Sequence, residues 1–154
     1  MKRTVVIGLG NPILGDDGVG LEVARRIKNL SEGTGAPDVK ELGAGGLRLL
    51  EAMAGYDRAF IVDAMVSGRI PQGAARFMTM EELGPARNVA SEHDLDLPTA
   101  VEMGKLLGMD LPGEIRIMGI EASNVHAFGE SLTAELRESV PGAVDSIMKE
   151  LAGT

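Results

Sequence analysis

Two aspartates and a histidine are the side chains best suited to chemistry in this sequence. Asp17 follows the first apolar run, Asp63 stands near the end of another, and His93 lies in a polar loop. Ligands of a parallel sheet bind beyond the carboxyl ends of its strands, so both aspartates are expected at that edge. If the histidine loop folds over it, the three side chains converge. Such a set can hold a divalent ion such as zinc or nickel, with positions left for water or substrate.

Each of these residues also has a plain structural interpretation. An aspartate at a helix start often caps it by accepting a hydrogen bond from an N–H two or three residues on. That explains one of the adjacent pair Asp16 and Asp17 but not the other. An acid at the end of a strand often caps a turn, and a loop histidine is usually solvated. Spacing alone therefore leaves both a metal site and a structural role open.

The glycine loop that precedes Asp16 and Asp17 could be taken for a nucleotide-binding turn. A dinucleotide fingerprint needs a third glycine, however, and Ile13 occupies that position. The two carboxylates would also repel a pyrophosphate at the helix start, where unpaired N–H groups otherwise attract anions. Nucleotide binding is therefore disfavoured, although saturable binding that Asp17→Ala leaves unaffected would revive it.

Several other catalytic arrangements are excluded by composition. The chain has no cysteine, so it has no disulfide, thiolate nucleophile or sulfur ligand, and any metal must be bound through oxygen and nitrogen. No Gly-x-Ser-x-Gly turn is present to support a serine triad. Asp16 and Asp17 do not make an aspartic-protease pair, because sequence neighbours need not face a common proton.

His126 is flanked by apolar residues and is expected to pack locally, which leaves it as a spare ligand only.

Size and charge narrow the class of protein. A chain of 154 residues is long enough for one domain, residues 1–154, and short for two. The net charge of −8, with no basic cluster longer than Arg25-Arg26, argues against a nucleic-acid partner. No apolar run has the form of a signal peptide or a membrane span, so a cytoplasmic protein without a membrane partner is expected.

Strands and helices alternate along the chain. Strands are predicted from Thr4 and over 39–42, 59–66, 75–80 and 114–120, and helices over 19–30, 47–53, 97–107 and 132–151. Pro141 is expected to kink the last helix or divide it in two. The alternation predicts an α/β fold, a single three-layer domain with a mainly parallel twisted sheet and helices on both faces.

Three sequence motifs together resemble a known family. They are Gly8-Leu9-Gly10-Asn11 with Gly15-Asp16-Asp17-Gly18-Val19-Gly20, the strand Phe60-Ile61-Val62-Asp63-Ala64, and the loop Ser91-Glu92-His93-Asp94-Leu95. Over nearly the whole chain, the sequence resembles the hydrogenase maturation endopeptidases, which remove a C-terminal extension from the large subunit of nickel–iron hydrogenase. The resemblance implies that Asp17, Asp63 and His93 are metal ligands.

The same resemblance implies a nickel-dependent endopeptidase that trims a hydrogenase large-subunit precursor after nickel insertion. The substrate would supply the nickel, although zinc or another divalent metal could occupy the same ligands. We also expect Asn11, Asp16 and Gly43 to contact substrate. At Gly43, the bare turn at 43–46 could merely shape the chain or could let an extended peptide approach closely. The metal could polarise the scissile carbonyl, activate water, or act as a mark that orients the peptide. No nucleophile or general base is assigned.

Two segments depart from the family pattern. The turn Glu41-Leu42-Gly43-Ala44 lacks the hydroxyl residue often found there, which puts a role for that hydroxyl in doubt. The segment 119–124 matches only loosely, which leaves the particular substrate open. The alternative function is a noncatalytic metal or partner-binding module with the same fold, which would bind metal without cleaving a precursor. The sequence sets neither the cleavage site nor the oligomeric state.

Overall fold

A five-stranded sheet forms the middle layer of the computed structural model, which describes residues 2–43, 45–80, 97–123, 125 and 127–153. The strands are β1 (Thr4–Leu9), β2 (Asp38–Leu42), β3 (Arg58–Met65), β4 (Ala75–Thr79) and β5 (Glu114–Glu121). Their spatial order is β2-β1-β3-β5-β4. The first four strands of this order are parallel, and β4 runs antiparallel to β5. The predicted, mainly parallel sheet is confirmed.

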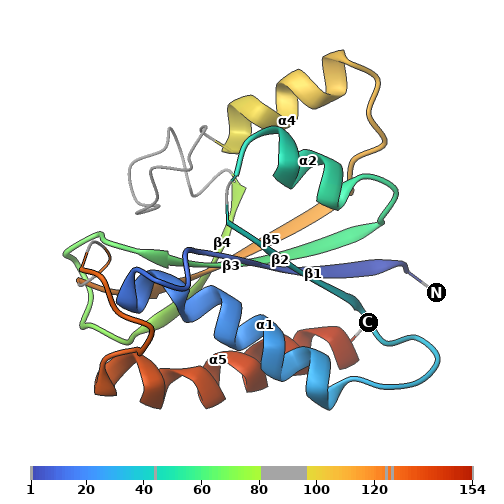
Figure 1. Ribbon diagram of the computed structural model, residues 1–154. Coiled ribbons are helices and arrows are strands. Elements are labelled where there is room, and N and C mark those ends of the chain that lie inside the picture. Colours follow the sequence, from blue (N-terminus) through green and yellow to red (C-terminus); the bar gives the residue numbers. More distant parts are fainter. Residues whose placement is uncertain (1, 44, 81–96, 124, 126, 154) are drawn as a thin grey trace.

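Helices cover both faces of this sheet (Figure 1). On one face lie α1 (Val19–Leu30) and α5 (Ala134–Ala152), and on the other lie α2 (Leu47–Met53) and α4 (Leu97–Leu106). Each pair of helices encloses its own apolar core against the sheet. The three-layer α/β domain expected from the sequence is therefore confirmed.

The central strands β1 and β3 are buried along their whole length, because both of their faces are covered. Successive side chains point to opposite faces of a strand. Val6 and Phe60 accordingly join the core beneath α1 and α5, whereas Val5 and Ile61 join the core beneath α2 and α4. Two-sided burial explains why these strands read as continuous apolar runs in the sequence.

The last helix is a single element despite its internal proline. α5 runs without interruption through Pro141, so of the two predicted outcomes, a kink or a division into two helices, the division does not occur. Proline cannot donate to the carbonyl of Arg137 one turn earlier. Pro141 and Gly142 lie on the exposed side of the helix, however, where water can solvate that carbonyl, and Val140 is buried on the inner side. A missing bond is therefore tolerated on this face.

The other predicted elements agree with the structure to within one residue at each end, apart from the start of the last helix. Among the residues that the structure describes, the 3-10 turn η1 (Gly15–Gly18) between β1 and α1 was not predicted. Within the described part of the chain, no helix combines the length and the apolar character needed to cross a bilayer.

The start of α1 lies against the ends of β1 and β3, and glycine makes this approach possible. A methyl group on Gly20 would lie 2.3 Å from the carbonyl oxygen of Val62 and 2.6 Å from that of Leu9. One on Gly8 would lie 2.5 Å from the carbonyl oxygen of Gly20. These separations are far too short for a carbon atom. The two glycines therefore bring the first turn of α1, together with η1, against the central strands.

Gly20→Ala should lower the free energy of unfolding by about 1–3 kcal/mol, because the added methyl forces α1 away from the sheet. This loss should outweigh the gain of up to about 1 kcal/mol that alanine brings to a helix. Gly142→Ala is the matched control, since a methyl there meets nothing within 4 Å and should leave Tm unchanged or raise it. Urea and thermal unfolding measure both variants. Equal stability of the Gly20→Ala and Gly142→Ala variants would contradict the close contact between α1 and the central strands.

Candidate active site

Two buried aspartates lie at the carboxyl edge of the sheet. Asp17 belongs to η1, directly after the loop that follows β1, and Asp63 is the third residue from the end of β3. Each of the two residues is only 2 % exposed. Because η1 contacts β3, the turn that carries Asp17 lies beside the strand that carries Asp63. The elements that carry the first two of the three predicted metal ligands are therefore in contact.

The loop in front of Asp17 fixes the position of its carboxylate. Oδ2 of Asp17 accepts a hydrogen bond of 2.8 Å from the backbone N–H of Asn11, and the Asp17 N–H donates to the carbonyl of Leu14 at 3.1 Å. The side chain of Asn11 in turn accepts a bond of 3.1 Å from the N–H of Ile13. A methyl group on Gly10 would lie 2.1 Å from the Asp17 carbonyl oxygen. The loop is therefore closely folded around this residue.

Asp16 has different partners from its neighbour. It is fully buried, and its Oδ1 accepts a bond of 2.7 Å from the N–H of Thr133, the residue that precedes α5. Its Oδ2 accepts from the Thr133 hydroxyl at 2.9 Å and from Gln72 Nε2 at 3.5 Å. Asp16 thereby ties η1 to the start of α5. A substrate contact by Asp16 stays a prediction, and it would require these bonds to break.

The helix-cap interpretation of this pair does not hold for α1. The residue at the N-cap of α1 is Gly18, which has no side chain to offer. Asp17 instead binds backwards to the loop before it, and Asp16 binds to another helix. Both adjacent acids are thus accounted for, one by the candidate site and one by the fold.

Asp16→Ala should lower the free energy of unfolding by about 1–3 kcal/mol, because it leaves the N–H and hydroxyl of Thr133 without their acceptor. Thr133→Val removes only the hydroxyl and should cost about 1 kcal/mol. The double variant should lose less than the sum of the two, because both changes break one shared contact. Urea unfolding of all three proteins measures this coupling. Simple additivity would show that the two side chains act independently.

Glu121 is a further buried acid at this edge, and the sequence pattern did not single it out. It ends β5, is 4 % exposed, and accepts hydrogen bonds from the N–H and hydroxyl of Ser67 and from the N–H of Gly68 at 3.0 Å. It therefore holds the loop that follows β3. An acid at the end of an apolar strand was the available signal, and it is the same signal that pointed to Asp63.

The remaining predicted site residues lie outside the described residues or lack a functional contact there. His93 and His126 both lie outside the described residues, so their roles stay predictions. Asn11 is half-buried and its side chain bonds within its own loop. Gly43 is exposed after β2, and a methyl on it would meet nothing within 4 Å. Among the described residues, no three histidine, cysteine, aspartate or glutamate side chains form a metal-binding group.

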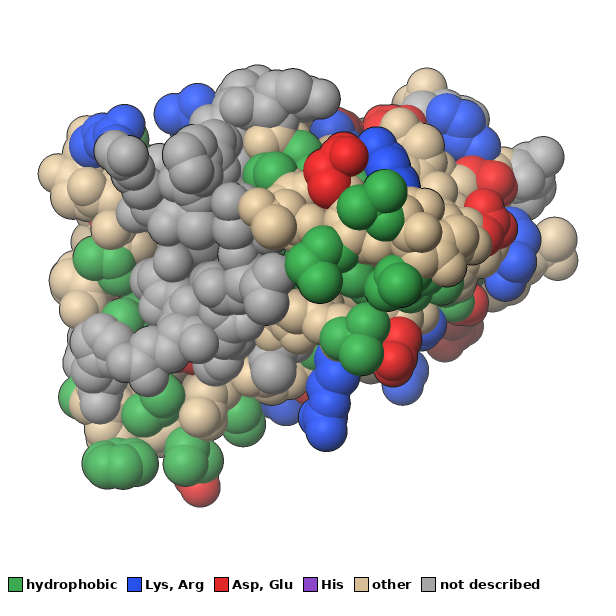
Figure 2. Space-filling model, turned by 90° about the horizontal axis from the view of Figure 1, so that it is seen from above, with side chains coloured by type: hydrophobic (Ala, Val, Ile, Leu, Met, Phe, Trp, Pro, Cys, Tyr) green, Lys and Arg blue, Asp and Glu red, His purple; other side chains and the backbone are tan. Residues whose placement is uncertain are grey.

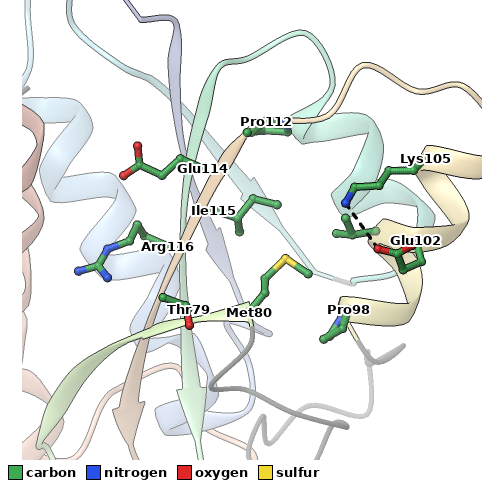
Figure 3. A pocket seen from close by; sticks show the side chains of 11 residues that line it. Thr79, Met80, Pro98, Glu102, Lys105, Pro112, Glu114, Ile115 and Arg116 are labelled. Atoms are coloured by element: carbon green, nitrogen blue, oxygen red, sulfur yellow. Dashed lines mark hydrogen bonds and ion pairs between the residues drawn. The ribbon is translucent and has the colours of Figure 1, made fainter.

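A cavity of about 450 Å³ lies at the opposite end of the sheet, between α4 and β5 (Figure 3). Its lining includes Met80, Val101 and Ile115, and a hydrogen bond of 3.5 Å joins Lys105 to Glu102 on α4. The cavity adjoins the amino end of β5, whereas Asp17 follows the carboxyl end of β1 and Asp63 lies near that of β3. It is therefore separate from Asp17 and Asp63.

The sheet topology and the acids at its carboxyl edge define a class of α/β protein, and sequence comparison identifies that class. The model of the family described as hydrogenase maturation protease matches residues 3–150. The chain therefore belongs to the hydrogenase maturation protease family, a family of hydrolases. The resemblance based on the three motifs is confirmed.

Relatives of known identity match along nearly all of their length. The hydrogenase 2 maturation protease of Escherichia coli strain K12 is 28 % identical over 156 residues, which cover 97 % of this chain and 90 % of the relative. The hydrogenase maturating endopeptidase HybD from E. coli superposes with a TM-score of 0.84 at 24 % identity, covering 98 % of this chain and 93 % of the other. The [NiFe] hydrogenase maturation protease HybD from Thermococcus kodakarensis gives 0.73 at 26 % identity, covering 97 % and 99 %.

Proposed function

We propose that this chain is a nickel-dependent endopeptidase that removes the C-terminal extension of a nickel–iron hydrogenase large subunit after metal insertion. Membership of the family supports the protease activity, and the names of the relatives support a hydrogenase precursor as substrate. The structural observation that carries the proposal is the placement of Asp17 and Asp63, both buried, at the carboxyl edge of the sheet. The proposal places this reaction in the cytoplasm, with no membrane or nucleic-acid partner.

The chemistry of the proposed ligands suits a divalent ion. Buried carboxylates are costly unless cations or hydrogen-bond donors balance their charge. Asp17 and Asp63 together would offset the charge of a 2+ ion, and the imidazole of His93 as third ligand would suit nickel or zinc. In this proposal the nickel belongs to the incoming precursor, while zinc or another divalent metal can occupy the same ligands in its absence.

Two roles for the ion are compatible with this set of ligands. The ion could polarise the scissile carbonyl or activate a water molecule, or it could serve to orient the precursor's tail. The contribution of the chain is to hold the ligands in place: the hydrogen-bonded loop fixes Asp17, and the buried strand β3 fixes Asp63. In either case cleavage would follow nickel insertion, so only precursors that already contain nickel would be trimmed.

Replacement of a proposed ligand should abolish trimming and leave the protein folded. Asp63→Asn keeps the size of the side chain but removes its charge, and His93→Ala removes the imidazole. Loss of the C-terminal tail from a nickel-loaded large-subunit precursor, followed by intact mass, measures the activity. Asp145→Asn is the matched control, because Asp145 is an exposed acid of α5. This variant should trim the precursor at the wild-type rate. Full processing of the precursor by the His93→Ala variant would contradict the assignment of His93 as a ligand.

Asp17→Asn should weaken binding of Ni²⁺ to the free protein by about tenfold or more, since loss even of an outer-shell partner costs about 10–100-fold. Isothermal titration calorimetry compares this variant with the wild type and with Asp145→Asn. Unchanged affinity would count against Asp17 as a ligand. The alternative function, a noncatalytic binding module, predicts nickel binding by the wild type but no cleavage of any loaded precursor.

A further inference from the structure

Two exposed hydrophobic side chains lie in loops at the same edge as Asp17. Ile13 is 48 % exposed and Phe128 is 85 % exposed. Figure 2 shows hydrophobic side chains along its left-hand end, the end at which β1 and β3 finish in Figure 1. Contiguous apolar side chains that remain open to water often mark a binding surface.

Backbone hydrogen bonds hold Ile13 and Phe128 next to each other. The N–H of Gly15 donates to the carbonyl of Gly129 at 2.8 Å, and the N–H of Gly129 donates to the carbonyl of Ile13 at 2.9 Å. These bonds form a short parallel bridge between Leu14 and Gly129. Ile13 and Phe128 directly precede the two bridged residues, so their backbones lie side by side. We refer to them as the apolar pair.

The bridge also connects the apolar pair to the candidate ligand. Leu14, which makes the bridge, accepts a hydrogen bond from the N–H of Asp17. A peptide cleaved beside Asp17 would pass this loop, and an extended peptide advances about 3.3 Å per residue. Side chains only a few residues from the scissile bond therefore lie within reach of Ile13 and Phe128.

We propose that Ile13 and Phe128 bind an apolar side chain of the precursor polypeptide close to the bond that is cut, and so help to select the substrate. This inference rests on the proposed peptidase function. The occupant is the substrate chain, because the apolar pair borders the ligand loop itself. A second copy of this protein bound there would cover the edge that a precursor must reach.

A second group of exposed hydrophobic residues supplies a matched control. It consists of Leu47 on α2, Met103 and Leu106 on α4, and Leu107 just after α4, and Leu106 is 87 % exposed. Figure 2 shows hydrophobic side chains gathered over these helices as well. α4 lines the cavity at the amino end of β5, away from the aspartates. Leu106→Ser therefore removes an equally exposed apolar side chain outside the proposed contact.

The test compares the trimming kinetics of Phe128→Ser, Ile13→Ser and Leu106→Ser on nickel-loaded hydrogenase large-subunit precursors. Phe128→Ser should raise KM about tenfold or more and leave kcat unchanged, because burial of a phenylalanine is lost equally from the ground and transition states. Ile13→Ser should raise KM less, and Leu106→Ser should match the wild type. All three variants should keep the wild-type Tm and Ni²⁺ affinity, since the altered side chains are exposed and are not ligands.

Each result bears on the inference separately from the proposed function. If the wild type trims and the apolar-pair variants keep its KM, or if only Leu106→Ser raises it, the contact is overturned and the peptidase function stands. If the wild type binds the precursor without trimming it and Phe128→Ser weakens that binding, the contact is supported and the peptidase function fails. A wild type that neither binds nor trims any loaded precursor overturns both.

Discussion

The close approach of α1 to the central strands is the constraint on which the rest of the site depends. Any side chain at position 20 would collide with the carbonyl oxygens of Val62 and Leu9, so only glycine fits there. Contact at this short range places η1, which carries Asp17, against β3, which carries Asp63. The relative position of the two elements that carry these acids is therefore a consequence of backbone packing.

Much of the fold could be predicted from the sequence, because its signals are local. Two-sided burial gives β1 and β3 their continuous apolar runs, and helical spacing marks α1 clearly. A division of α5 at Pro141, one of the two outcomes predicted there, does not occur, because the tolerance of a proline depends on whether its helix face meets water, and that is a tertiary property. The antiparallel direction of the edge strand β4 likewise depends on its path after the β3 loop rather than on its own residues.

The candidate site was less open to sequence reasoning, because adjacent residues of one type received different roles. Asp16 and Asp17 look equivalent in the chain, yet one anchors α5 through Thr133 and the other joins the loop after β1. The partner of Asp16, Thr133, lies 117 positions away in the chain. No local sequence pattern could therefore predict this role. Glu121 was overlooked for a related reason: its partners, Ser67 and Gly68, come from a loop far away in the sequence.

These buried acids also explain how a rigid edge can coexist with selective binding. Asp16 joins η1 to α5 and contacts Gln72 in the loop after β3, while Glu121 holds the beginning of that same loop. Through these hydrogen bonds Asp16 and Glu121 hold the loops in place. The exposed apolar pair has the opposite character, since Ile13 and Phe128 remain open to contact from outside. Discrimination would then have two independent requirements, a metal that the ligands accept and an apolar side chain at a fixed distance from it.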